Sequence, residues 1–194
     1  MSEEFEIAIV GSGPSGLSAA ARAAQKEISH ILLETTDHAS DTIYKFQKRK
    51  FVMATPDVMP LRSDTSFAAG TREEILEKWD EEIEHQKVNI SYNSEVTGIS
   101  GEKGNFTLEV KGGRTIKANH VVLSIGMQGN LRKLDVDGDD WEYVQYQLDD
   151  PEEYEDETII VVGAGDAAIE NAIALAAQNR VALVNRKGEF ARIK

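Results

Sequence analysis

The chain has 194 residues, a formal net charge of −13 and no cysteine. The lack of cysteine excludes disulfides, thiolate nucleophiles, Cys-ligated zinc and dithiol exchange on this polypeptide. So acidic a chain repels phosphate backbones, and we therefore expect no nucleic-acid partner. No apolar run reaches the roughly 18 residues of a membrane span, and the chain starts on acidic residues, so we expect no membrane span, no signal peptide and a cytoplasmic location.

Five short apolar runs predict the strands of a parallel sheet. Each is rich in Ile, Val or Leu and lacks polar alternation, as in strands that are buried on both faces. The runs are Ile7–Val10, Ile31–Leu33, Val121–Leu123, Ile159–Val162 and Val181–Val184. A buried helix is the alternative, but none of the runs has the length of a typical helix.

Helices are expected between these runs. The Ala-rich segment Ser15–Glu27 separates the first two runs and gives a strand–helix–strand order. A second helix is predicted over Thr71–His85, because Thr71 and Glu74 form a T-x-x-E capping box. Its apolar stripe is predicted to consist of Leu76, Trp79 and Ile83.

The segment Ser94–Ala118 has the pattern of antiparallel strands instead. Apolar and polar residues alternate from 106 to 110, and a Gly-Gly turn signal follows at 112–113. We expect three strands, at roughly 94–100, 105–110 and 114–118, as a small meander inserted into the parallel fold. From Asp135 to Glu157, 12 of 23 residues are acidic, which predicts a solvated connector.

A glycine-rich loop lies between the first predicted strand and the first predicted helix. Its sequence, Gly11-Ser12-Gly13-Pro14-Ser15-Gly16, is G-x-G-x-x-G in the context that dinucleotide binding requires. Gly11 permits the tight turn, Gly13 lets a pyrophosphate approach the backbone, and Gly16 lets helix and strand pack closely. Glu34 ends the next strand, 18 residues after Gly16, where a carboxylate can accept both ribose hydroxyls of an adenosine. A glycine turn without a ligand is the alternative.

A second copy of this unit begins 152 residues later. Its loop, Gly163-Ala164-Gly165-Asp166-Ala167-Ala168, is G-x-G-x-x-A and leads into an Ala-rich helix predicted over Ala167–Ala177. The strand after this helix ends at Asn185-Arg186-Lys187, so a guanidinium and an ammonium replace the acid of the first unit. Two cations suit a 2′-phosphate and favour NADP(H) over NAD(H). A surface Arg-Lys pair in a turn is the alternative.

Two such loops with a β-meander between them resemble the flavoproteins that have two dinucleotide-binding domains. The chain is most similar to the thioredoxin-reductase-like branch of the pyridine nucleotide–disulfide oxidoreductase family, and within it to a cysteine-free subgroup. The resemblance implies that FAD lies at Gly11–Gly16 and Glu34, and that NADP(H) lies at Gly163–Ala168 with Arg186 and Lys187. It also implies that Ser124 and Gly126 lie beside the flavin, where the family has A-T-G, and that the backbone of Val96 lies near the adenine.

The same resemblance implies two domains. Residues 1–150 would form an FAD-binding domain that lacks its C-terminal segment, and residues 151–194 would start an NAD(P)-binding domain of the same Rossmann-like α/β class. We therefore expect an N-terminal fragment of the family's full length. Lys45, in the basic cluster Tyr44–Lys50, is a candidate to stabilise charge on a reduced flavin. A solvated loop that balances nearby acids is the alternative.

The predicted function is that of an FAD-dependent oxidoreductase. A hydride would pass from NADPH to FAD, and electrons would then pass to an unidentified acceptor or to a fused or partner redox domain. Because the cofactors carry this chemistry, no side chain is expected to act as a catalytic acid or base or as a metal ligand. Two alternatives stay open, a non-catalytic module that binds FAD or a nucleotide and a flavin monooxygenase-like enzyme. The sequence also leaves a homodimer open.

Overall fold

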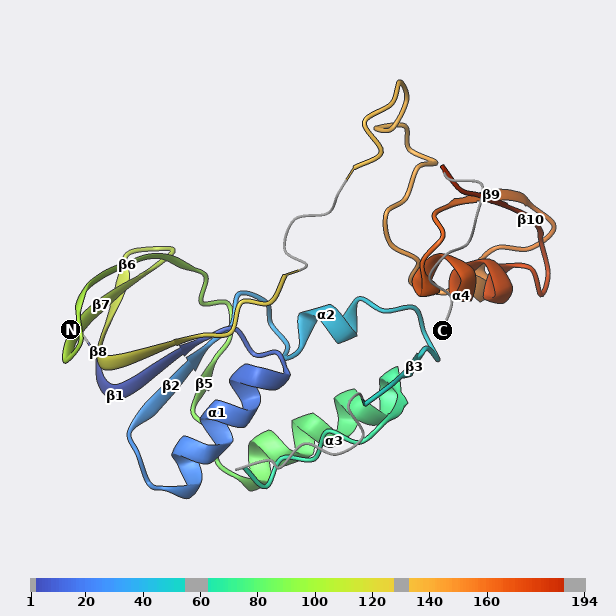
Figure 1. Cartoon of the computed structure of the whole chain (residues 1–194). Helices are drawn as coiled ribbons and strands as arrows, with labels where there is room; N and C mark the ends of the chain where they lie inside the picture. The colour runs from blue at the N-terminus through green and yellow to red at the C-terminus, as the bar shows by residue number, and fades with distance from the viewer. Residues whose placement is uncertain (1–2, 55–62, 128–132, 187–194) are drawn as a thin grey trace. The chain divides into compact units, whose positions relative to one another are not determined.

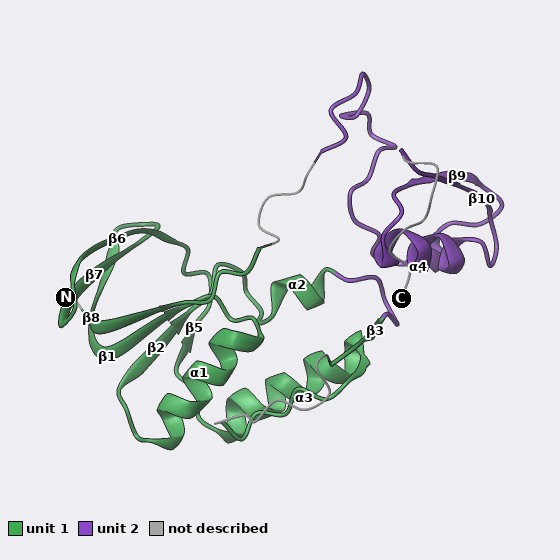
Figure 2. Ribbon diagram, viewed as in Figure 1, with its two compact units in different colours: residues 1–45, 51–132 green, residues 46–50, 133–194 purple. Residues whose placement is uncertain are grey.

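The computed structural model describes residues 3–54, 63–127 and 133–186. They form two compact units, residues 1–45 with 51–132 and residues 46–50 with 133–194 (Figure 2). The sequence predicts an FAD-binding domain up to residue 150 and an NAD(P)-binding domain after it. Because these domains are defined by the cofactors that they bind, this division stays a prediction.

A six-stranded sheet is the framework of the first unit (Figure 1). Its order is β5 (Ile90–Ser91), β2 (His30–Leu33), β1 (Glu3–Val10), β8 (Arg114–Leu123), β7 (Asn105–Val110) and β6 (Val96–Glu102). The strands from β5 to β8 pair in parallel, whereas β7 pairs antiparallel with both β8 and β6. The predicted α/β class with an inserted meander is confirmed.

One difference concerns strand β8. The sequence predicts a meander strand near 114–118 and a separate parallel strand at Val121–Leu123, but the structure has a single strand over both. Residues 114–118 pair with β7 on one side, while residues 116–123 pair with β1 on the other. The meander is therefore continuous with the parallel sheet through this shared strand.

Two layers cover the central strands. Helix α1 (Pro14–Gln25) packs on β1 and β2, with Leu17, Ala20 and Ala21 buried. On the other face, Ala8 and Leu33 belong to one apolar cluster with Leu108 and further residues of the meander. The parallel strands are therefore buried on both faces, which explains their unbroken apolar sequences.

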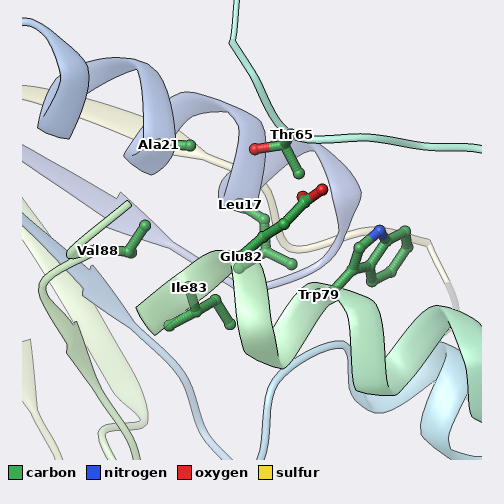
Figure 3. Close-up of a pocket in the computed structure, with 7 residues that line it drawn as sticks. All are labelled: Leu17, Ala21, Thr65, Trp79, Glu82, Ile83 and Val88. Carbon is green, nitrogen blue, oxygen red and sulfur yellow. The ribbon is translucent and has the colours of Figure 1, made fainter. Parts of the chain in front are cut away.

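Helix α3 (Arg72–His85) packs beside α1. The predicted capping box is confirmed, since Glu74 accepts hydrogen bonds from the backbone and hydroxyl of Thr71, at 2.8 and 2.9 Å. The predicted apolar stripe is shifted, because the buried residues are Ile75 and Trp79, whereas Leu76 is only partly buried. A gap of about 10 Å³ separates the two helices (Figure 3), room for at most one water molecule.

Short elements complete the first unit. Helix α2 (Asp41–Tyr44) follows β2, and β3 (Phe51–Val52) pairs antiparallel with β4 (Gly70–Thr71). Across the described ranges of both units, no helix combines the length and the apolar character that crossing a membrane requires.

The second unit contains one strand–helix–strand motif. Strands β9 (Thr158–Val162) and β10 (Arg180–Val184) pair in parallel, and α4 (Asp166–Leu175) connects them. Helix α4 contacts both strands. All three predicted elements are present within two residues of their predicted bounds.

The acidic connector is not uniformly solvated. It includes a short 3-10 helix, η1 (Pro151–Glu153), and it packs with the basic segment 46–50 inside the second unit. Asp150 accepts a hydrogen bond from Lys48 Nζ at 2.7 Å, and Arg49 lies 2.9 Å from a carboxylate oxygen of Glu152. Lys50 likewise lies 2.6 Å from Glu170 of α4. These contacts form an ionic clasp between two segments about 100 residues apart in the sequence.

The clasp is expected to loosen in acid. The pKa of Asp150 lies below its usual 3.8, mainly because its carboxylate accepts a hydrogen bond from Lys48 and, to a smaller extent, because it accepts one from the Glu152 amide. Because this pKa is lower in the folded chain, the carboxylate stabilises the fold fully above the usual value, and this contribution is lost as the pH falls through the folded pKa. We expect Asp150→Asn to lower the melting temperature at pH 5. Between pH 5 and pH 3, the melting temperature of this variant should then fall less than that of the wild type. Asp137→Asn, at an exposed site of the same connector, is the control, and an equal response of both variants would contradict the prediction.

Candidate functional site

The first glycine loop lies where three strands of the first unit end. Gly11 follows β1, and its N–H donates to the carbonyl of Leu33 in β2 at 2.9 Å. Its φ of +94° is a conformation that favours glycine. A Cβ at position 11 would lie 2.5 Å from the carbonyl oxygen of Ser124, just beyond β8. A Cβ on Gly16 would overlap the carbonyl oxygen of Gly11, so both glycines are required by close packing.

Gly13 has a different environment. A Cβ at this position would meet nothing within 4 Å, so the loop backbone there faces open space. Gly13 is also the N-cap of α1, and Pro14 and Ser15 form its exposed first residues. This helix start has no side-chain cap and no acid in its first turn, whereas the start of α3 is closed by its capping box. The uncapped amides of α1 are therefore available to an anion.

Glu34 directly follows β2 and is 7% exposed. Its Oε2 accepts hydrogen bonds from the N–H and the hydroxyl of Ser12, at 2.9 and 2.5 Å. Its Oε1 accepts from the N–H of Thr36 at 3.1 Å. A buried carboxylate is thus held beside the glycine loop by donors of the protein, and its role as a ribose ligand stays a prediction.

Three further predicted residues lie at this edge or near it. The N–H of Ser124 donates to the carbonyl of Val10 at 2.8 Å, and the Ser124 side chain would lie 3.3 Å from a Cβ on Gly16. Gly126, two residues on, is exposed with a φ of +64°. Val96 starts β6 two residues after Ser94, whose N–H donates to the carbonyl of Glu34 at 2.7 Å. The structure therefore brings the backbone near Val96 to the Glu34 side of the loop.

Sequence reasoning missed an apolar margin beside this loop. Leu123 and Ile125 are 62% and 69% exposed, and the Cα of Ile125 would lie 3.3 Å from a Cβ on Gly11. Exposed apolar side chains next to an open glycine backbone suit a ligand that has both a flat ring system and phosphates. Their position after a strand at the carboxyl edge is the signal that could have found them.

Lys45 lies at the C-cap of α2, and its ammonium is 2.6 Å from Asp41. The neighbouring cations Lys48, Arg49 and Lys50 belong to the ionic clasp in the second unit. The alternative interpretation, that the basic cluster balances nearby acids, therefore holds for those three residues. A role of Lys45 beside a flavin stays a prediction.

The second glycine loop makes the same backbone hydrogen bond to its neighbouring strand as the first. The N–H of Gly163 donates to the carbonyl of Val184 at 2.9 Å, just as Gly11 donates to Leu33. The residue after Val184, Asn185, therefore takes the position of Glu34, and Arg186 comes next. Gly165 is the uncapped N-cap of α4, and a Cβ on it would also meet nothing within 4 Å.

Three further predicted residues of the second site, Asp166, Ala167 and Arg186, are at the same edge. Asp166 and Ala167 form the first turn of α4, and Arg186 is exposed beyond β10. Lys187 is outside the described residues. The loop, the helix start and the guanidinium together have the form of a dinucleotide site without an acid for the ribose. Within the described ranges, no group of three or more His, Asp or Glu side chains has the geometry of a metal site.

Two strand–glycine loop–helix–strand units of this kind define a protein class that binds two dinucleotides. The chain belongs to the pyridine nucleotide-disulphide oxidoreductase family, whose model matches residues 8–194. The predicted family is thereby confirmed. Members of this family use FAD and NADP(H), in agreement with the two cofactors that the sequence predicts.

Individual relatives agree with this assignment. The chain is 30% identical to a ferredoxin–NADP reductase of Picrophilus torridus, over 90% of this chain and 51% of that protein. It is 25% identical to a thioredoxin reductase of Peptoclostridium litorale, over 98% of this chain and 57% of that protein. The chain thus spans about half the length of the curated relatives it matches.

Solved structures confirm the fold. A bacillithiol disulfide reductase from Staphylococcus aureus superposes with a TM-score of 0.85 at 22% identity, covering 99% of this chain and 60% of that one. A thioredoxin reductase from Lactococcus lactis gives 0.71 at 21% identity, covering 95% and 57%. At these identities the likeness concerns the fold alone.

Proposed function

We propose that this chain provides the FAD site and part of the NADPH site of a flavin-dependent oxidoreductase. The observation that carries the proposal is the repeated glycine loop, with the same Gly N–H bond to a neighbouring strand in each unit. A carboxylate follows that strand in the first unit, and Asn185 with Arg186 follows it in the second. When bound, the two cofactors supply the redox chemistry, a hydride transfer from NADPH to FAD and onward electron transfer.

In the first unit, the protein's part is to bind and orient. The open backbone at Gly13 and the amides of α1 would receive the pyrophosphate of FAD. Glu34 would accept from the adenosine ribose, and the backbone near Val96 would border the adenine. Leu123 and Ile125, with Ser124 and Gly126, would border the ring system and exclude water from it.

In the second unit, cations replace the acid. The amides at the start of α4 would receive the pyrophosphate of NADPH, and Arg186 with Lys187 would bind its 2′-phosphate. Several relatives are named for ferredoxin, and one is named for thioredoxin. We propose a small redox protein as the electron acceptor, and because these 194 residues contain no cysteine, electrons leave without a dithiol on this segment.

The visible spectrum of the purified chain tests the proposal. A flavin absorption band that NADPH bleaches without oxygen supports the oxidoreductase. A flavin band that NADPH does not change supports a non-catalytic FAD-binding module. A colourless protein that takes up no added FAD contradicts the assignment of the first site.

Arg186→Ala is expected to weaken NADPH binding selectively. Loss of one charge-assisted hydrogen bond to a phosphate costs about 1.5–3 kcal/mol, which is roughly a 10- to 100-fold rise in Kd. NADH has no 2′-phosphate, so its Kd should stay within about twofold. Titration calorimetry with both nucleotides measures this ratio.

Arg180→Ala is the matched control, because Arg180 begins the same strand at its opposite end. It should leave the Kd for both nucleotides unchanged. If Arg186→Ala leaves the NADPH affinity unchanged as well, the role in 2′-phosphate binding is wrong.

A further inference from the structure

Ser12 connects two loops in the first unit. It is completely buried, and its hydroxyl contacts both Glu34, just after β2, and Ser40, six residues further along. The N–H of Ser40 donates to the Ser12 hydroxyl at 3.0 Å, and the Ser40 hydroxyl donates back to the Ser12 carbonyl at 3.1 Å. Ser40 is itself 2% exposed and has a φ of +59°. The glycine loop and the segment after β2 are therefore joined by a reciprocal pair of serines.

The direction of each hydrogen bond follows from the donors. A backbone N–H can only donate, so the Ser12 oxygen accepts from Ser40. The single hydroxyl proton of Ser12 then points to Oε2 of Glu34, at 2.5 Å. The Ser12 N–H donates to the same oxygen at 2.9 Å. Two donors from one residue thus occupy both lone-pair directions of Oε2.

The other carboxylate oxygen is less occupied. Oε1 accepts from the Thr36 N–H at 3.1 Å. The hydroxyl of Thr36 lies 3.2 Å from Oε1 but only 2.8 Å from the carbonyl oxygen of His38, and this shorter distance assigns its one proton to the carbonyl. Oε1 therefore keeps one lone pair, while Oε2 keeps none.

We propose that Ser12 is a positioning residue that leaves Glu34 with one carboxylate oxygen free to accept from the ribose. With Oε2 occupied, only Oε1 accepts from the adenosine, so one of the two ribose hydroxyls is bound by Glu34 and the other is not. This inference rests on the proposed FAD site at the first glycine loop. It goes further, because a carboxylate at the end of a strand would by itself be expected to accept both hydroxyls.

The test compares ADP, 2′-deoxy-ADP and 3′-deoxy-ADP as competitors of FAD on the full chain. In the wild type, removal of one hydroxyl should raise the competitor's Kd roughly 10-fold or more, the value of one hydrogen bond to a charged group, and removal of the other should change it less than about twofold. In Ser12→Ala, Oε2 regains a free lone pair. Both hydroxyls should then matter equally, and the ratio of the two deoxy affinities should fall to within about twofold.

The ratio separates positioning from a general loss of structure. A variant that is merely less folded binds all three nucleotides more weakly and keeps the wild-type ratio. Ser18→Ala is the matched control, because Ser18 lies on α1 and bonds the Ser63 hydroxyl at 2.9 Å, away from Glu34. It should keep the ratio. If Ser12→Ala does not fold, equal dependence on both hydroxyls in the wild type still contradicts the inference.

Two results would overturn the inference while leaving the FAD site in place. One is equal dependence on both hydroxyls in the wild type, and the other is an unchanged ratio in Ser12→Ala. A wild-type chain that binds neither FAD nor ADP would overturn the proposed function itself, and the inference with it.

Discussion

Gly13→Ala is expected to abolish FAD binding and to leave the first unit folded. The Gly13 backbone has a φ of −67°, which alanine adopts without strain, and a Cβ there meets no atom within 4 Å. The methyl group would instead occupy the space over the loop backbone that a pyrophosphate needs. We expect the melting temperature of the apoprotein to change by less than about 2 °C, a shift of well under 1 kcal/mol. FAD titration should show a loss of at least about 100-fold.

Gly11→Ala gives the contrasting result. Here the φ of +94° and a contact of 2.5 Å with a backbone oxygen both oppose a Cβ. The expected loss of stability is more than about 2 kcal/mol, visible as a lower melting temperature before any cofactor is added. If Gly13→Ala destabilises the apoprotein as much as Gly11→Ala does, the space at Gly13 is not open, and if it leaves the FAD affinity unchanged, that space is not the pyrophosphate site.

Glu34→Ala is expected to have the second large effect. The substitution removes the ribose acceptor and leaves the Ser12 and Thr36 amides without their partner. Each unsatisfied buried donor costs about 1–3 kcal/mol, so both FAD affinity and stability should fall. We expect the Kd for FAD to rise roughly 100-fold, with a smaller rise in Glu34→Gln, which keeps one carbonyl oxygen.

The matched control for this prediction is Glu102→Ala, which removes an exposed carboxylate at the end of β6. It should leave FAD binding and the melting temperature unchanged. Fluorescence titration with FAD and thermal unfolding measure both quantities. An FAD affinity that does not respond to Glu34→Ala would show that this residue is not the ribose ligand.

Both strand–helix–strand units could be predicted from the sequence because their signals are local. Apolar runs, glycine spacing and Ala-rich helices lie within about 30 residues of one another. The continuity of β8 could not be predicted in this way, because it depends on pairing with β1, which is more than 100 residues away. The shift of the α3 stripe from Leu76 to Ile75 has a similar cause, since the neighbouring elements decide which side of a helix is buried.

The site shows the same limit. The glycines and Glu34 follow a known spacing, but the contacts of Ser12 depend on Ser40, 28 residues away in a left-handed conformation that its residue type does not announce. For the basic cluster, the sequence shows the positive charge but not the residues that pair with it. Its partners, Asp150 and Glu152, lie about 100 residues further along the chain.

Those partners determine how the polypeptide can be divided. Because residues 46–50 belong to the second unit, the chain crosses between the units three times, after residues 45, 50 and 132. After a single protease cut in the connector, residues 46–50 would stay on the N-terminal piece, while the acidic residues that pair with them would be on the other. Neither unit corresponds to one uninterrupted stretch of sequence, so a fragment that starts at residue 133 lacks residues 46–50 and the ion pairs that they make with Asp150, Glu152 and Glu170.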